Sequence, residues 1–165
     1  MMRIEGGYYL DTPLLSDAHA VVEHLQCREI YENTLRIPWP YTFADAQQWL
    51  AHLDVLHTYA IREPGGMLVG ATGFHEIVPA HKSEFGYWLA RPYWNQGLMT
   101  RIVAAMVRHA WDELGLVRLT AEVFAHNAAS MRVLEKNGFI REGILRKHVV
   151  KDGKFIDAVL YSKVR

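Results

Sequence analysis

The order of strand-like and helix-like segments constrains the fold more than any other feature of the sequence. Beyond residue 57, short runs of β-branched and aromatic residues alternate with two amphipathic stretches, and two strand-like runs close the chain. Glu63-Pro-Gly-Gly66 and Lys151-Asp-Gly153 are strong turn signals between such runs. This order predicts an α/β (α+β) fold, with a mixed, largely antiparallel twisted sheet of about seven strands flanked by helices.

The same signals give approximate bounds for each element. Strands are predicted over 7–10, 58–62, 68–77, 83–89, 118–124, 139–150 and 155–163. Ser16-Asp17 is expected to cap a helix that runs to about Gln26, and a second short helix ends near Thr34. The capping-box pattern Thr42-Phe-Ala-Asp45 starts a helix whose apolar periodicity continues to Leu56.

Two further helices are predicted over 100–114 and 128–137, and they are ended by Gly115 and Gly138. The apolar face of the first should carry Val103, Ala104, Val107, Trp111 and Leu114.

Length and composition exclude several classes of protein. The 165 residues suit a single domain over 1–165, and 18 basic residues balance 18 acidic ones, so a nucleic-acid partner is not expected. Cys27 is the only cysteine, which leaves no intramolecular disulfide. No apolar run approaches the length of a membrane span, and the first residues lack a signal-peptide pattern. We therefore expect a soluble cytoplasmic protein with no membrane association.

The junction Gly86-Tyr-Trp-Leu-Ala-Arg-Pro-Tyr-Trp-Asn-Gln-Gly-Leu-Met-Thr-Arg101 links a predicted strand to a predicted helix. The free N–H groups and positive dipole end of such a helix form an anion site, and Gly97 lets the backbone approach a phosphate closely. The junction contains neither Gly-x-Gly-x-x-Gly nor Gly-Lys-Ser/Thr, which disfavours Rossmann and P-loop sites. By itself the junction fits an ordinary strand–helix connection better than a diphosphate site.

A second motif, Asn127-Ala-Ala-Ser-Met-Arg-Val-Leu-Glu-Lys-Asn-Gly-Phe139, follows a strand and opens a helix. Together with the junction it resembles the GCN5-related N-acetyltransferase superfamily and, within it, the ribosomal-protein alanine/serine N-terminal acetyltransferase subgroup. The resemblance covers nearly the whole chain and is densest between residues 83 and 161. The matching positions are Trp39-Pro-Tyr41, Gly86-Tyr-Trp88, Tyr93-Trp94, Asn127-x-x-Ser130, Glu135-Lys-x-Gly-Phe139, Glu142-Gly-x-Leu-Arg146, Gly153 and Asp157.

The resemblance implies that acetyl-CoA is the cosubstrate and lies in a cleft formed by a splayed strand pair. Backbone groups would meet the pantetheine at Tyr87, Trp88 and Leu89. The pyrophosphate would be surrounded by Asn95, Gln96, Gly97, Leu98, Met99 and Thr100. Asn127 would hydrogen-bond the cofactor near the pantetheine. The family motif Arg/Gln-x-x-Gly-x-Gly/Ala is altered here, with Trp94 and Met99 at its first and last positions and Arg101 where a glutamate is frequent.

The implied activity is acetyl transfer to a primary amine by direct attack on the thioester. The N-terminal α-amine of a protein such as a ribosomal protein is the first acceptor considered. A small amine (an antibiotic, a polyamine or an amino acid) remains open, as does a non-catalytic acyl-CoA-binding regulatory module. The resemblance also allows a homodimer. An α-amine has a reference pKa of about 7.7 to 8 against about 10.4 for lysine, so an N-terminal acceptor needs only a weak base.

Candidate catalytic residues follow from the proton transfers that the reaction needs. Many superfamily members place an acidic tyrosine seven residues after the asparagine, but this chain has Leu134 there, so Ser130 becomes the candidate acid. The alternative, which we favour less, is that Ser130 only caps the helix together with Asn127. Glu84 is the first candidate base and Glu122 the second, although either could be an ordinary strand glutamate. The base proposed for the subgroup falls near Val149.

The remaining histidines and aromatic residues do not point to a further catalytic or metal site. His75-Glu76 with His81 does not match a zinc-binding spacing, so no metal site is predicted. Trp39, Tyr41 and Trp49 either line the acceptor cleft or are buried under the first helices.

Overall fold

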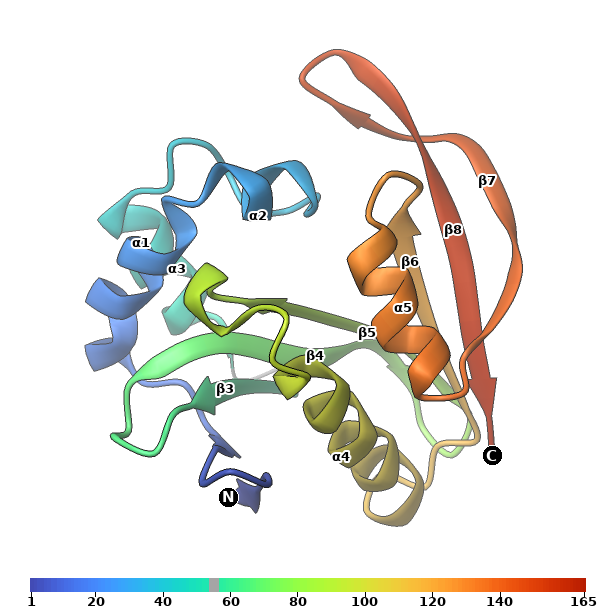
Figure 1. The fold of residues 1–165 in the computed structure, drawn as a ribbon, viewed down its shortest axis with the longest axis horizontal. Coiled ribbons are helices and arrows are strands. Elements are labelled where there is room, and N and C mark those ends of the chain that lie inside the picture. Colours follow the sequence, from blue (N-terminus) through green and yellow to red (C-terminus); the bar gives the residue numbers. More distant parts are fainter. Residues whose placement is uncertain (54–56) are drawn as a thin grey trace.

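The computed structural model describes residues 1–53 and 57–165. In this part of the chain eight strands form one sheet in the order β1-β2-β3-β4-β5-β6-β8-β7 (Figure 1). The strands are β1 (Met2–Arg3), β2 (Tyr9–Asp11), β3 (Thr58–Arg62), β4 (Leu68–Val78), β5 (Lys82–Leu89), β6 (Arg118–Phe124), β7 (Ile140–Lys151) and β8 (Lys154–Val164). The helices are α1 (Ala18–Leu25), α2 (Arg28–Glu32), α3 (Phe43–Ala51), α4 (Leu98–Asp112) and α5 (Ala128–Lys136), with 3₁₀ turns η1 (Leu15–Asp17) and η3 (Arg91–Tyr93).

The predicted fold class is confirmed, with one strand more than expected. The additional strand is β1, a two-residue segment paired with β2, which is too short to leave a periodic pattern in the sequence. Pairing is antiparallel throughout the described sheet except between β5 and β6, which are parallel. The α4 crossover connects these two strands, as parallel pairing requires.

The parallel pair separates soon after it begins. The register between β5 and β6 covers only Lys82↔Arg118, Ser83↔Leu119 and Glu84↔Thr120, although both strands continue beyond it. Figure 1 shows the two strands diverging from this end. The sheet is therefore opened along the remaining length of β5, and this confirms the predicted splayed pair.

Two apolar clusters lie on opposite faces of the sheet. Ala60 and Ile61 are neighbours on β3 and are both fully buried, but each belongs to a different cluster because successive side chains point to opposite faces. The first cluster contains Ile61 with α4 and part of α5, and the second contains Ala60 with α1 and α3. The open part of β5 thus has helices on both sides.

The buried stripe of α4 is wider than predicted and centred elsewhere. Ile102 and Met106, which were not in the predicted face, are fully buried at its centre. Of the predicted face, Val103 and Val107 are buried, while Ala104, Trp111 and Leu114 are only half-buried. The helix packs against both the sheet and α5, so more of its circumference is covered than an amphipathic pattern on one side suggests.

Local signals fixed several helix ends. Thr42 Oγ1 accepts a hydrogen bond from Asp45 N at 3.2 Å and Asp45 Oδ2 accepts one from Thr42 N at 2.8 Å, so the predicted capping box starts α3. Leu56, the last apolar residue expected in that helix, lies outside the described residues. Gly115 and Gly138 have φ values of 63° and 74° after α4 and α5, as the predicted ends require.

The predicted cap at the start of α1 is wrong. Asp17 precedes α1 without making a side-chain cap, because its carboxylate is instead bound by the guanidinium of Arg62 at 2.8 Å through each oxygen. In the part of the chain that is described, no helix combines the length and the apolar character needed to cross a bilayer.

Candidate active site

The opened edge of β5 forms one wall of a cleft of about 1280 Å³. The cleft is also lined by residues of α2 and the loop after it, α3, β4, the start of α4, the open part of β6 and the first turns of α5. Because β6 leaves the register after Glu84, it does not cover the backbone edge of β5 from Phe85 onward. An unpaired strand edge offers N–H and C=O groups to a ligand with amide groups of its own.

Tyr87, Trp88 and Leu89 all line this cleft, as the pantetheine interpretation requires. One of their carbonyl groups is already engaged, since Trp94 Nε1 donates to Leu89 O at 2.7 Å. This contact explains the tryptophan at the first position of the altered motif: its indole ties the turn back to the end of β5. The carbonyl of Leu89 is consequently less available to a ligand.

The turn that follows β5 is held by its own side chains. Gln96 Nε2 donates to Pro92 O at 2.7 Å, and Arg101 Nη1 donates to Gln96 O at 3.3 Å. Asn95 and Gly97 both have positive φ values, 60° and 69°. Arg101 therefore brings a positive charge against the turn, which gives a structural role to the residue that replaces the frequent glutamate.

Helix α4 begins at Leu98, two residues earlier than predicted, because Gly97 in the left-handed region acts as its N-cap. Its first intrahelical bond runs from Arg101 N to Gly97 O at 3.2 Å, so the N–H groups of Leu98, Met99 and Thr100 have no intrahelical acceptor. The side chains of Leu98 and Met99 are buried in the core. Only the backbone of these two residues can serve a phosphate, which also explains why methionine fits the last motif position.

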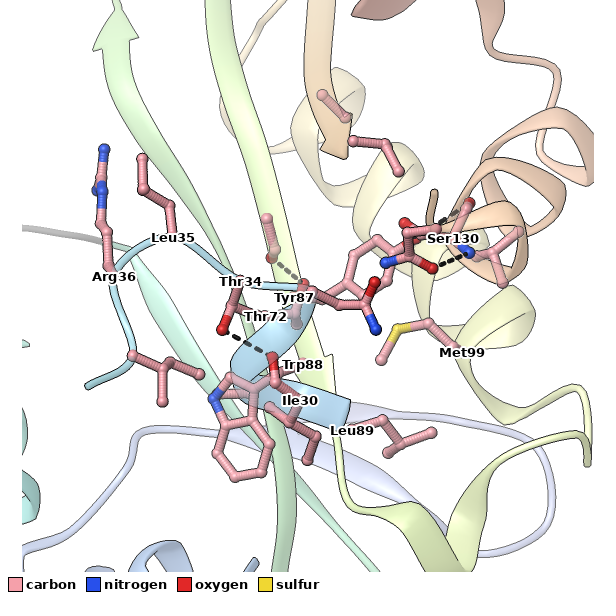
Figure 2. A pocket seen from close by; sticks show the side chains of 18 of the residues that line it. Ile30, Thr34, Leu35, Arg36, Thr72, Tyr87, Trp88, Leu89, Met99 and Ser130 are labelled. Carbon is pink, nitrogen blue, oxygen red and sulfur yellow. Dashed lines mark hydrogen bonds between the residues drawn. The ribbon is translucent and has the colours of Figure 1, made fainter. Parts of the chain in front are cut away.

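Asn127 and Ser130 lie at the start of α5. Asn127 Oδ1 accepts from Ser130 N at 3.1 Å and caps the helix, which leaves the Asn127 amide nitrogen free to donate elsewhere. The hydroxyl of Ser130 does not cap the helix. It lies 2.8 Å from the phenol oxygen of Tyr87, and Figure 2 shows the two side chains directed toward each other at the cleft. Leu134 is fully buried in the core and presents no polar group.

Tyr87 was expected to contribute only backbone groups, and the role of its side chain was missed. Burial raises the pKa of Tyr87 to about 12, and the hydrogen bond with Ser130 acts in the opposite direction. The phenol is therefore protonated and neutral at physiological pH. No sequence signal links residue 87 to residue 130, because the contact joins a strand and a helix that are 43 positions apart.

The two candidate bases lie on the adjacent strands β5 and β6. Glu84 and Glu122 occupy neighbouring strands and both line the cleft. Burial raises the pKa of Glu84, the charge of Glu122 raises it further, and Arg36 acts against this. Glu122 Oε2 lies 3.0 Å from Nε2 of His148. Glu84 thus has the environment of a base that takes up a proton more readily than an exposed glutamate does.

The position expected for the subgroup's base contains no carboxylate. Val149 is buried there, and the adjacent His148 contacts Glu122 instead. Tyr41 and Trp49 line the cleft, and Tyr41 is also part of the buried cluster under α1 and α3, whereas Trp39 is exposed and is not part of the lining. No group of three metal-ligating side chains occurs within residues 1–53 and 57–165.

A family model described as the acetyltransferase (GNAT) domain matches residues 9–140. The chain belongs to the GNAT acetyltransferase family. The matched segment includes the splayed strands, the turn at Gly97 and the Asn127–Ser130 cap, and it ends at the start of β7.

Individual GNAT relatives agree with this assignment. The chain is 36% identical over 99 residues to YoaA of Bacillus subtilis, an uncharacterised N-acetyltransferase, in an alignment that covers 59% of this chain and 56% of YoaA. It is 31% identical over 98 residues to the ribosomal-protein-serine acetyltransferase of Escherichia coli, covering 59% of this chain and 55% of that protein. The chain thus spans about half the length of these relatives.

The GNAT fold also extends to solved structures. The microcin C7 self-immunity acetyltransferase MccE, solved with acetyl-CoA and AMP, superposes with a TM-score of 0.89 over 98% of this chain and 94% of MccE. At 19% identity this similarity concerns the fold.

Proposed function

We propose that this chain transfers the acetyl group of acetyl-CoA to a primary amine by direct attack of the amine on the thioester. The observation that carries the proposal is the opened β5 edge, which ends at the free N–H groups of α4 and passes the Ser130 hydroxyl. One site therefore combines hydrogen-bonding groups for an amide-containing arm, an anion site and a proton donor.

The cosubstrate would be held mainly by backbone groups. The pantetheine arm would follow β5 at Tyr87, Trp88 and Leu89. The diphosphate would lie against the turn of Asn95, Gln96 and Gly97 and against the N–H groups of Leu98, Met99 and Thr100, where the dipole of the 15-residue α4 favours negative charge. The amide nitrogen of Asn127, which is not used in the cap, would donate to the cofactor.

The proton transfers can be assigned to two residues. Glu84 would accept a proton from the attacking amine, and the raised pKa of Glu84 suits this role. As the C–S bond breaks, the proton of Ser130 would move to the departing sulfur, and water in the open cleft would return a proton to Ser130 after turnover. The acidic wall formed by Glu84 and Glu122 would also attract the cationic form of the amine before it is deprotonated.

We further propose the N-terminal α-amine of a protein, such as a ribosomal protein, as the acceptor. The similarity to a ribosomal-protein-serine acetyltransferase supports this choice. So does the chemistry of the site: one half-buried glutamate is sufficient for an α-amine, whereas deprotonating lysine at neutral pH requires over about 4 kcal/mol. A small amine is the alternative that the assay must separate from it.

The proposal is tested by following free thiol release from acetyl-CoA with a panel of N-terminal peptides, lysine side-chain peptides and small amines. The expected result is turnover with a free α-amine and much less with lysine. Ser130→Ala should lower kcat about a hundredfold, the lower end of the range for general acid catalysis, and leave the Kd for coenzyme A nearly unchanged. Turnover restricted to small amines would reject the protein acceptor, and equal turnover by Ser130→Ala would remove this residue from the mechanism.

A further inference from the structure

We propose that Tyr87 is a positioning residue for catalysis: its phenol donates a hydrogen bond to Ser130 Oγ, aims the serine proton at the cleft and stabilises the negative charge that this oxygen gains. The inference rests on the proposed function and extends it to a side chain that is not needed to explain cofactor binding.

The geometry fixes both partners from different elements. Tyr87 projects from β5 on the face that carries Phe85, whose ring centroid lies 5.6 Å from its own. Ser130 is held in the first turn of α5, where its backbone N–H is bonded to Asn127 Oδ1. The two hydroxyl oxygens are 2.8 Å apart, and the phenol oxygen is also 3.4 Å from Ser130 O. The contact therefore bridges the opened strand and the helix across the cleft.

The direction of this hydrogen bond follows from acidity. Either hydroxyl could donate at this distance, but a phenol is a stronger acid than an aliphatic alcohol, which favours Tyr87 as the donor and Ser130 Oγ as the acceptor. The serine proton is then directed away from Tyr87 and is free to be donated into the cleft. When that proton moves to the departing sulfur, an S–H bond forms, the Ser130 O–H bond breaks, and the oxygen becomes an alkoxide facing the phenol.

This change strengthens the Tyr87 bond during the reaction. A hydrogen bond to an ionised oxygen is about twice as strong as a neutral one, and a donor already in place requires no reorganisation. Stabilisation is therefore larger for the alkoxide than for the resting serine, which is the condition for lowering the barrier rather than tightening ground-state binding. Because the phenol, with its pKa of about 12, is still a stronger acid than an aliphatic alcohol, the shared proton shifts toward Ser130 Oγ as the alkoxide develops, and it returns to the phenol when water reprotonates the serine.

The test is Tyr87→Phe, which removes the hydroxyl and keeps the ring. The expected result is a kcat lowered about tenfold to a hundredfold, the range for losing one hydrogen bond to a charged group, with the KM for acetyl-CoA within about twofold. In the Ser130→Ala background, Tyr87→Phe should have no further effect, since the group through which it acts is gone.

Tyr161→Phe is the matched control. Tyr161 is also buried and its phenol donates to Glu135 Oε1 of the same helix at 2.7 Å, so this variant loses a phenol contact to α5 but none to Ser130. Its kcat should stay close to that of the unaltered chain. A Tyr87→Phe kcat equal to that of Tyr161→Phe, or an effect that adds fully to Ser130→Ala, would overturn the inference while leaving acetyl transfer intact.

A second measurement tests the same role if Tyr87→Phe folds poorly. A ring-fluorinated tyrosine at position 87 keeps the hydroxyl but has a lower pKa, so its ionisation should remove the donor and bring the alkaline loss of kcat to a lower pH than in the unaltered chain. An alkaline limb that does not move would refute the role of the phenol. Absence of thiol release by the unaltered chain would overturn the proposed function, and this inference with it.

Discussion

Gly97→Ala separates the contribution of one glycine to folding from its contribution to cofactor binding, because α4 has a comparable glycine near each end. Gly97 has φ +69° as the N-cap, and Gly115 has φ +63° beyond the last turn. A Cβ at Gly97 would meet Arg101 Nη1 at 3.6 Å, an ordinary contact, and a Cβ at Gly115 would meet nothing within 4 Å. Neither alanine clashes, so both changes carry only the cost of a left-handed residue, about 1 to 2 kcal/mol.

Both variants should therefore lose similar stability, about 1 to 2 kcal/mol by urea unfolding or a few degrees in Tm. Coenzyme A affinity should distinguish them. Gly97 is the N-cap directly before the N–H groups of Leu98, Met99 and Thr100, so a Cβ there would take up room that a phosphate needs. Loss of one hydrogen bond to a charged phosphate costs about 1.5 to 3 kcal/mol. Calorimetric titration should thus show a Kd raised about tenfold to a hundredfold or more for Gly97→Ala alone.

Two results with this pair of variants would refute the reasoning. A Kd for Gly97→Ala within twofold of the unaltered chain would remove the turn from the diphosphate site. An equal rise in Kd for Gly115→Ala would show that general loss of stability, rather than the local backbone, controls binding.

Further predictions concern ionisable groups elsewhere in the chain. Arg62→Met should cost about 3 to 5 kcal/mol by urea unfolding, since it leaves the buried Asp17 carboxylate unpaired, whereas Arg165→Met at an exposed pair should cost under about 1. Burial alone would raise the pKa of Asp17, but the Arg62 hydrogen bonds, the Leu14 N–H and the Arg62 charge lower it overall. The ionised Asp17 carboxylate therefore contributes to the free energy of unfolding above its unfolded pKa of about 3.9, and this contribution is lost as pH falls through the folded pKa. In acid unfolding curves, Arg62→Met should abolish this loss. Because burial and then Glu122 raise the pKa of Glu84, the acid limb of kcat/KM should lie above the ordinary glutamate value of about 4.3 and shift lower in Glu122→Gln.

The sequence predictions were accurate where the deciding interactions are between neighbouring residues, and less accurate where residues far apart in the sequence meet. The bounds of β3 and β6 were predicted residue for residue, because turn residues and β-branched runs mark them locally. The start of α4 was placed two residues late, since the pattern of apolar side chains does not show that Gly97 adopts a left-handed conformation. The cap assigned to Asp17 failed because its carboxylate is bound by Arg62, 45 residues away, and by the N–H of Leu14.

The candidate site divides in the same way. Local sequence motifs located the turn at Gly97 and the helix start at Asn127, because phosphate-binding turns and caps are built from consecutive residues. Only the tertiary structure shows that Trp94 hydrogen-bonds the end of β5 and that Tyr87 hydrogen-bonds Ser130. Both contacts depend on where separate elements come to rest against one another.

The sequence by itself determined the order of strands and helices and the two backbone turns at the cleft, since these depend on preferences of neighbouring residues. The tertiary structure decided where β6 leaves β5, which carbonyl groups stay free and which hydroxyl faces Ser130. These outcomes are set by packing between distant segments, which contributes to the free energy only after the chain has folded.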